Sequence, residues 1–399
     1  MLVAATGVGA GDLMTAGLAG ARLGVSIFWA VLFGAILKWT LNEGIARWQL
    51  ATGESLLEGW ATRMGLHWPF LAYLLIWSFV VGGALISAAG VAGVALIPLG
   101  EDVQFGRRVW GIVHSIAGVV LIFAGGFRVF ERMMGVCIGV MFVTVMACAV
   151  WIAPQVDWSA LRWVNPLQLS GDELKWTLGL IGGVGGTVTL LSYGYWIREE
   201  GRQGASGLWL CRLDLALGYG MTAAFGVGML IIAAATPEIS RRGAELLVLL
   251  SERLGGELGP VARWLFLLGA WGAIFSSLLG VWQGVPYLFA DALRHTPLWR
   301  PPIADRSLTR TVPYRLFVLF LAGPTIVLLW RRVEWVQLWY AVLGALFMPA
   351  LAATLLVMNN HRTWTPAAFR SGWRINLLLV ITLAFFLITG AQKLVQALA

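Results

Sequence analysis

The sequence predicts an all-α membrane protein that crosses the bilayer many times, built as a five-plus-five inverted repeat with one further helix. Three observations predict this fold class. First, 59% of the 399 residues are hydrophobic, 12% are charged, and the mean hydropathy is +0.80, whereas soluble domains carry about 25% charged residues. Second, long apolar runs separated by short arginine clusters continue along the chain. Third, glycines interrupt the first and sixth runs at matching places.

The apolar runs define candidate spans of about 18–30 residues, long enough to cross the hydrocarbon core with some tilt. In chain order they cover residues 2–21, 25–51, 69–98, 109–126, 132–153, 174–197, 207–236, 261–292, 312–330, 334–358 and 374–398. The stretch 238–258 is amphipathic, which predicts a surface helix. The connections are too short for a separate soluble domain. We therefore expect 1–399 to form one transmembrane domain, with repeats over about 1–153 and 174–358 and an extra helix at 374–398.

The first span contains an acid beside a cluster of glycines. Gly7, Gly9 and Gly11 precede Asp12 in "ATGVGAGD". Glycine weakens a helix, and a carboxylate in hydrocarbon is costly. A helix broken here exposes carbonyl and N–H groups that can bind a substrate or ion, and Asp12 adds a negative charge. We expect Thr6, Gly9 and Asp12 to belong to a binding site, with Asp12 as the metal ligand if a metal is bound.

The second span carries ionisable groups inside an apolar run. Lys38 and Asn42 are four residues apart and share a helical face, and Glu43 lies slightly off that face. One interpretation is structural: Lys38 finds a carboxylate or a carbonyl, and Glu43 reaches Arg47. The other is functional: the Lys38 ammonium neutralises Asp12 or occupies a site that coupling cations use, because charges within a membrane are costly enough to suggest function.

The sixth span, "LGLIGGVGGTVTLLSYGYW", has four glycines at its midpoint. Two glycine-interrupted spans five helices apart are typical of inverted-repeat transporters with discontinuous helices. The alternative is that the glycines only allow helices to pack closely. If the helix is broken, Gly186 offers a backbone carbonyl, and Thr187 and Thr189 offer hydroxyls to a bound ion or solute.

The net charge of +8 comes mainly from arginines in short loops. In a membrane protein such loops face the cytoplasm or lipid headgroups, so we do not expect nucleic acid as a partner. The loops 294–310 and 361–374 are strongly basic and lie on the same predicted side. If that side is cytoplasmic, the N-terminus is inside, in the inner membrane of a bacterium.

No enzyme site is predicted. Cys137, Cys148 and Cys211 lie singly in apolar runs, without the spacing of a disulfide framework or metal site. The four histidines are scattered, so no zinc site is expected. There is neither a nucleophile–base pair nor a Walker sequence. A non-transporting sensor or scaffold is disfavoured because no soluble domain is predicted to report a signal.

Several motifs resemble those of the Nramp (natural resistance-associated macrophage protein) divalent-metal transporters, in the same order along the chain. They are "LVAATGVGAGDLMTAGLAGARLGV", "ARWQLATGESLLE", "GGFRVFERMMG", "GGTVTLLSYGYW", "RLDLALGYG" and "LGALFMPALAATLLV". The resemblance implies a LeuT-like fold, with helices 1 and 6 broken, ten core helices plus one, and alternating access.

The sequence departs from this family at the metal site. The family's Asp-Pro-Gly-Asn falls on Gly9-Ala10-Gly11-Asp12, and its span-six thioether falls on Thr189, near the backbone-ligand position Gly186. By the same resemblance, its following Pro-His pair falls on Leu190-Leu191, and its polar span-ten Gln falls on Val342.

The acids that the family links to proton movement in its third span fall on Ala84 and Ser87. Their loss argues against family-style proton coupling.

The remaining oxygen ligands suit Mg²⁺ better than softer metals, because a thioether favours transition metals. We expect a carrier of a Mg²⁺-like divalent cation without proton coupling, with membrane lipid as its surroundings. The alternative is the same scaffold carrying a small organic solute with an amine or several hydrogen-bonding groups. No cofactor is expected beyond Mg²⁺ or Mn²⁺ as substrate, and the carrier is expected to be a monomer.

Overall fold

The computed structural model describes residues 9–124, 127–161, 171–183, 186–235, 246–299 and 308–398, and within them every regular element is a helix. The α-helices are α2 (Ala10–Leu23), α3 (Phe28–Thr52), α4 (Leu56–Gly59), α5 (His67–Leu96), α6 (Val103–Ala124), α7 (Phe127–Ile152), α8 (Gly171–Gly183), α9 (Ser192–Glu199), α10 (Gly204–Ala234), α11 (Leu246–Leu258), α12 (Pro260–Leu293), α13 (Val312–Ala322), α14 (Val333–Met358) and α15 (Trp373–Leu398). The short 3₁₀ or π turns are η1 (Gly24–Ile27), η2 (Trp60–Met64), η3 (Ala153–Gln155), η4 (Trp158–Ala160), η6 (Val188–Leu191), η9 (Leu308–Arg310), η10 (Pro324–Trp330) and η11 (Ala367–Phe369).

These helices have the length and composition of membrane spans. Among the described residues, 8 helical segments are long and apolar enough to cross a bilayer. Many apolar side chains on their outer faces are exposed, such as Ile76, Val150 and Leu316. Lipid-facing surfaces require this pattern, because backbone polar groups are satisfied within the helices and apolar side chains meet the hydrocarbon.

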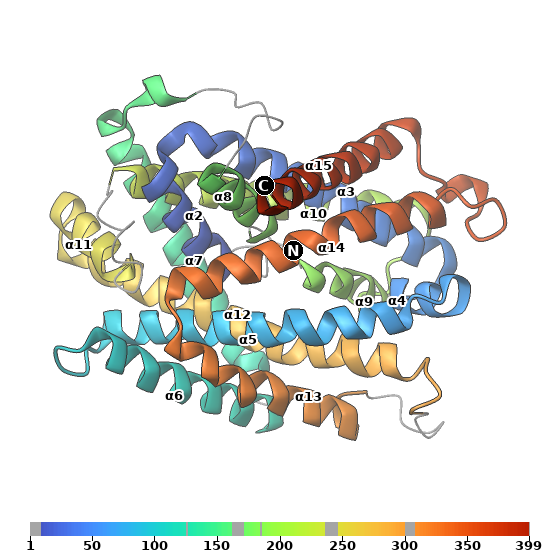
Figure 1. The fold of residues 1–399 in the computed structure, drawn as a ribbon, viewed down its shortest axis with the longest axis horizontal. Helices are drawn as coiled ribbons and strands as arrows, with labels where there is room; N and C mark the ends of the chain where they lie inside the picture. Colours follow the sequence, from blue (N-terminus) through green and yellow to red (C-terminus); the bar gives the residue numbers. More distant parts are fainter. Residues whose placement is uncertain are drawn as a thin grey trace.

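The long helices pack in two groups. In the first, α8 and α10 each contact both α2 and α3, and α9 contacts α3; in the second, α5, α6, α12 and α13 all contact one another. Helix α14 contacts α8 and α5, and α15 packs on α14. Figure 1 shows α5, α6, α12 and α13 running beside one another below α14, with α2, α8 and α15 above it. The first two spans of both predicted repeats thus lie in one group, and the third and fourth spans of both repeats lie in the other.

The sixth predicted span is discontinuous, as the glycines indicated. Helix α8 ends at Gly183, a 3₁₀ turn begins at Val188, and α9 continues from Ser192. At the first span, α2 begins at Ala10, and the half predicted before it lies outside the described residues.

The ninth predicted span, 312–330, is also interrupted. Its α-helix ends at Ala322, and a 3₁₀ helix follows from Pro324 to Trp330. Pro324 has no N–H to donate to a carbonyl in the preceding turn, so the α-helical ladder stops there. The amphipathic stretch at 238–258 forms α11 over its described part, Leu246–Leu258.

Candidate functional site

The break in the sixth span is built on two residues with non-helical backbone. Gly186 has φ +80°, in the left-handed region that favours glycine. Thr187 follows with φ −136° and ψ −94°, outside the helical region. The last carbonyls of α8 therefore lack the N–H donors that a continuing helix would supply.

Helix α14 packs closely against the residues on both sides of this break. Gly182 lies against the backbone of Ala341 and Ala345, and Gly344 lies against the side chain of Thr187. A Cβ at Gly344 would be 2.5 Å from Cγ2 of Thr187. The glycines thus serve close packing as well as the break, so packing is not their only role.

Thr187 brings an unsatisfied hydroxyl to the break. Its side chain is 1% exposed, and Oγ1 has no hydrogen-bond partner among the residues that the structure describes. A buried hydroxyl without a partner costs free energy, so such a group in a native structure suggests a ligand or water. Thr189 is half-buried on the following turn, beside Gly186.

Lys38 of α3 places its ammonium at the same break. The side chain is 1% exposed, and Nζ donates a 3.1 Å hydrogen bond to the carbonyl oxygen of Gly182. Gly182 is the penultimate residue of α8, where the helix dipole is negative and carbonyls need donors. The expectation that Lys38 finds a carbonyl is confirmed.

Asn42, one turn along α3, also lies at this interface. Its Nδ2 donates a 2.8 Å hydrogen bond to Oη of Tyr219 on α10, and Asn42 is 2% exposed. Lys38 and Asn42 therefore face α8 and α10 from one side of α3, as their spacing predicted.

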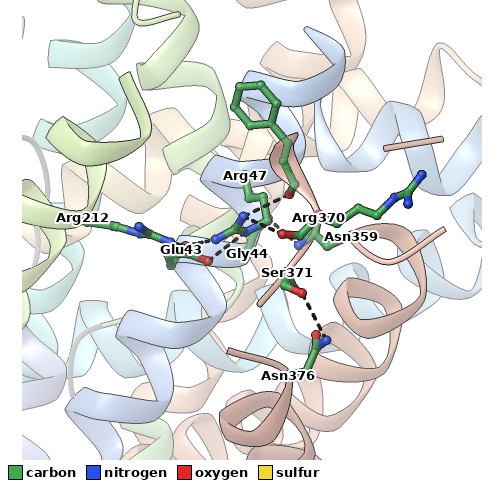
Figure 2. A network of polar contacts seen from close by, with 9 residues as sticks. Glu43, Gly44, Arg47, Arg212, Asn359, Arg370, Ser371 and Asn376 are labelled. Carbon is green, nitrogen blue, oxygen red and sulfur yellow. Dashed lines mark hydrogen bonds and ion pairs between the residues drawn. The ribbon is translucent and has the colours of Figure 1, made fainter. Parts of the chain in front are cut away.

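Glu43 lies in a separate network with two arginines (Figure 2). The carboxylate is 0% exposed; Arg47 Nη2 lies 2.5 Å from Oε1, and Arg212 Nη2 of α10 lies 2.7 Å from the same oxygen. Arg47 also donates to the carbonyls of Phe369 and Arg370, at 3.0 and 3.1 Å. The network joins α3, α10 and the segment before α15. The expected contact between Glu43 and Arg47 is confirmed.

Only the second half of the first predicted span lies within the described residues. Leu13 N–H donates to the carbonyl of Gly9 at 3.1 Å, which starts α2. Gly9 is buried against Ser277 of α12. Asp12 lies in the first turn of α2, but its side chain lies outside the described residues, as does the whole of Thr6.

A buried arginine lies on the other helix group. Arg107 of α6 is 1% exposed, and Nη1 donates to Oγ of Ser87 on α5 at 2.8 Å. Nη2 donates to the carbonyls of Leu329 and Arg331, at 2.7 and 3.2 Å. Nearby, Gln337 Nε2 donates to the carbonyl of Ala84 at 2.9 Å. A guanidinium held by neutral oxygens stays charged near neutral pH and does not serve as a proton carrier.

Asp291 near the end of α12 joins three segments of the chain. Its carboxylate accepts hydrogen bonds from Tyr195 of α9 and, at 3.3 Å, from Ser55 at the start of α4, and it pairs with Arg294 at 2.7 Å. This network ties the second half of the broken span to α12 and α4.

The sequence pattern of the natural resistance-associated macrophage protein-like (Nramp) family matches residues 1–396. The chain belongs to the Nramp family. No curated protein matches the sequence.

Solved structures agree with this assignment at the level of the fold. A variant of the manganese transporter of Eremococcus coleocola superimposes with a TM-score of 0.74 at 15% identity, over 97% of this chain and 84% of that one. MhsT in complex with L-phenylalanine gives 0.67 at 13% identity, over 98% and 96%. Mhp1, a nucleobase-cation-symport-1 family transporter, gives 0.58 at 14%, over 99% and 91%. The predicted LeuT-like fold of a membrane transporter is confirmed.

In this Nramp chain the structure brings together part of the predicted site. Lys38, Gly186, Thr187 and Thr189 gather at the break of the sixth span, whereas Glu43 belongs to a separate ion-pair network. Within the described residues no three His, Cys, Asp or Glu side chains cluster as metal ligands would.

Two partners in these networks were not predicted from the sequence: Arg212, which pairs with Glu43, and Tyr219, which accepts a hydrogen bond from Asn42. Nothing in the sequence around Arg212 distinguishes it from the many other arginines of the chain. Tyr219 is a polar residue inside the seventh span and could have been flagged on that ground.

Proposed function

We propose that this Nramp protein is an alternating-access carrier for a hydrated, Mg²⁺-like divalent cation, with the site at the breaks of the first and sixth spans. Family membership and the transporter fold support a carrier, and family resemblance supports a divalent cation as cargo. The observation that carries the site is the interrupted backbone between α8 and α9, where carbonyls and the unsatisfied Thr187 hydroxyl meet. Asp12 at the start of α2 would supply the carboxylate.

The available ligands favour a hard, hydrated ion. Thr187 and Thr189 offer oxygen where the resemblance places a thioether in the family, and soft transition metals prefer sulfur. Mg²⁺ loses its water reluctantly and is often held through one or two carboxylates, so one acid and several neutral oxygens suit it. The buried Lys38 ammonium beside Gly182 would oppose a bare dication, which also favours one that keeps its water shell.

Titration calorimetry with Mg²⁺, Mn²⁺ and Ca²⁺ on purified protein tests this proposal. We expect saturable Mg²⁺ binding, at least tenfold weaker in Asp12→Ala, because the first-span carboxylate supplies the main attraction. The control is Asp157→Ala, which removes an exposed carboxylate in a loop and should bind as the wild type does. Absence of heat from all three ions with folded protein would count against a metal carrier.

Transport is proposed to be uncoupled from protons. Ser87 and Ala84, which take the positions of acids in the resemblance, contact the permanently charged Arg107 and the amide of Gln337. We expect liposomes containing the protein and a pH-sensitive dye to take up Mg²⁺ without acidifying, at a rate that a pH gradient leaves unchanged within about twofold. The control is liposomes without protein, and acidification in step with uptake would contradict the proposal.

A second candidate is a carrier of a small organic solute, favoured by the Lys38–Gly182 hydrogen bond. A resident ammonium at the α8 terminus takes up a carbonyl that a dication would use. Thermal-shift measurements with a panel of amino acids and polyols test it. Stabilisation by one of these solutes, together with no heat from the three ions, would favour the organic cargo.

The remaining expectations concern placement in the cell. The protein is proposed to act as a monomer in a bacterial cytoplasmic membrane with its N-terminus inside, since the basic loops 294–310 and 361–374 would then face the cytoplasm. Cysteine labelling from either side, at His361→Cys in the second loop, tests this orientation.

A further inference from the structure

Lys38 has the features of a cation bound in a site rather than of a surface charge. Its side chain is 1% exposed, and Nζ lies 3.1 Å from the carbonyl oxygen of Gly182. That carbonyl belongs to the last turn of α8, where no helical N–H can reach it because the helix ends at Gly183. An unsatisfied carbonyl at membrane depth is costly, and the negative end of the helix dipole favours a positive charge there.

A second oxygen, the hydroxyl of Thr187, lies against the same turn of α14 as Gly182. Gly182 lies against Ala341 and Ala345 of α14, and Thr187 lies against Gly344, so both contact a single turn of that helix. The Thr187 hydroxyl is buried, and no described residue accepts or donates a hydrogen bond to it. The break therefore presents a carbonyl and a hydroxyl to a cation, as monovalent-cation and ammonium sites do.

We propose that the break between α8 and α9 is a monovalent-cation site that the chain fills with its own Lys38. The side chain acts as a tethered ammonium, satisfying the α8 terminus in place of a free ion. The intact protein accordingly takes up no free monovalent cation at this point. Shortening Lys38 opens the site to a free primary ammonium ion. This inference shares the Thr187 hydroxyl with the proposed cation site, but it concerns the resident charge, and its test needs no transported substrate.

The test is the thermal midpoint, Tm, of purified Lys38→Ala in n-propylammonium chloride. This ion has the chain length that the substitution removes and restores both the charge and the N–H donors. We expect Lys38→Ala to have a lower Tm than wild type, and n-propylammonium to recover most of the loss in a saturable way. Tetramethylammonium chloride at equal concentration, which has the charge but no N–H, should recover none of it. Wild type should respond to neither salt.

Lys38→Met provides a matched control, because it keeps an unbranched side chain only one atom shorter than lysine and carries no charge. We expect its Tm to be lowered as well, and n-propylammonium to have no effect, since the methionine fills the space. A Lys38→Met variant that melts as wild type does would overturn the proposal, and so would a Lys38→Ala variant that ignores n-propylammonium or responds equally to both salts. If Lys38→Ala is recovered folded only when it is purified in n-propylammonium, that dependence supports the proposal. The Tm of Lys38→Met then shows whether the charge of the ammonium is needed for stability.

Discussion

Glu43→Gln is expected to lower the free energy of unfolding by about 3–5 kcal/mol, the range for removing one partner of a buried ion pair. The Glu43 carboxylate is 0% exposed and faces both Arg47 and Arg212. Arg47 is itself 4% exposed at its side chain, so its charge would remain buried without a carboxylate. The carbonyls of Phe369 and Arg370 would still accept from it, but they carry no neutralising charge.

The measurement is equilibrium unfolding in mixed micelles, with the thermal midpoint as a second readout. Glu54→Gln is the matched control: it breaks the 2.8 Å pair of Glu54 with Arg63, whose side chains are 29% and 25% exposed. Pairs of that kind contribute about 0–1 kcal/mol. The double variant Glu43→Gln, Arg47→Gln should lose less than the two single variants added together, because it leaves no buried charge unpaired. Equal losses in Glu43→Gln and Glu54→Gln would contradict this account.

The sequence could predict the fold because its signals are local and strong. Apolar runs of membrane length, glycines at the centre of the sixth span and charges inside the second can each be recognised without knowing what they contact. The break at Gly186 and the proximity of Glu43 to Arg47 follow from such signals. The interruption at Gly323-Pro324 could have been predicted on the same basis, because a proline inside a span removes a donor.

Long-range pairing could not be predicted in this way. Arg212 is 169 residues from Glu43, and its sequence surroundings resemble those of other arginines near span ends. Lys38 was expected to find a carboxylate or a carbonyl, and it is the packing of α3 on α8 that brings its ammonium to the carbonyl of Gly182. The fold is set by patterns spread over many residues, whereas each contact of the site depends on how two distant helices meet.

Gly182→Ala is expected to disrupt the break and abolish binding at the site, with a stability loss of about 3 kcal/mol, the upper end of the usual range for overpacking. The added methyl group would collide with the carbonyl oxygen of Ala341, and it would lie 3.1 Å from Cβ and 3.2 Å from N of Ala345. These are atoms of the α14 backbone or fixed to it, so they cannot rotate away. Separation of α8 from α14 would also displace the Gly182 carbonyl from Lys38.

Two further glycine substitutions separate packing from backbone conformation. Gly280→Ala in the middle of α12 meets open space, so it should be neutral or slightly stabilising, because alanine is the better helix former. Gly186→Ala would instead hold an alanine at φ +80°, at a cost of about 1–2 kcal/mol for left-handed backbone.

If unfolding and ion or solute binding are measured on all three, Gly280→Ala should match wild type. Gly186→Ala should lose stability through strain, and Gly182→Ala should lose more, through the contact of α8 with α14. A Gly182→Ala variant as stable as Gly280→Ala would mean that α8 does not pack this closely, and the Lys38 site at its end would have to be reconsidered with it.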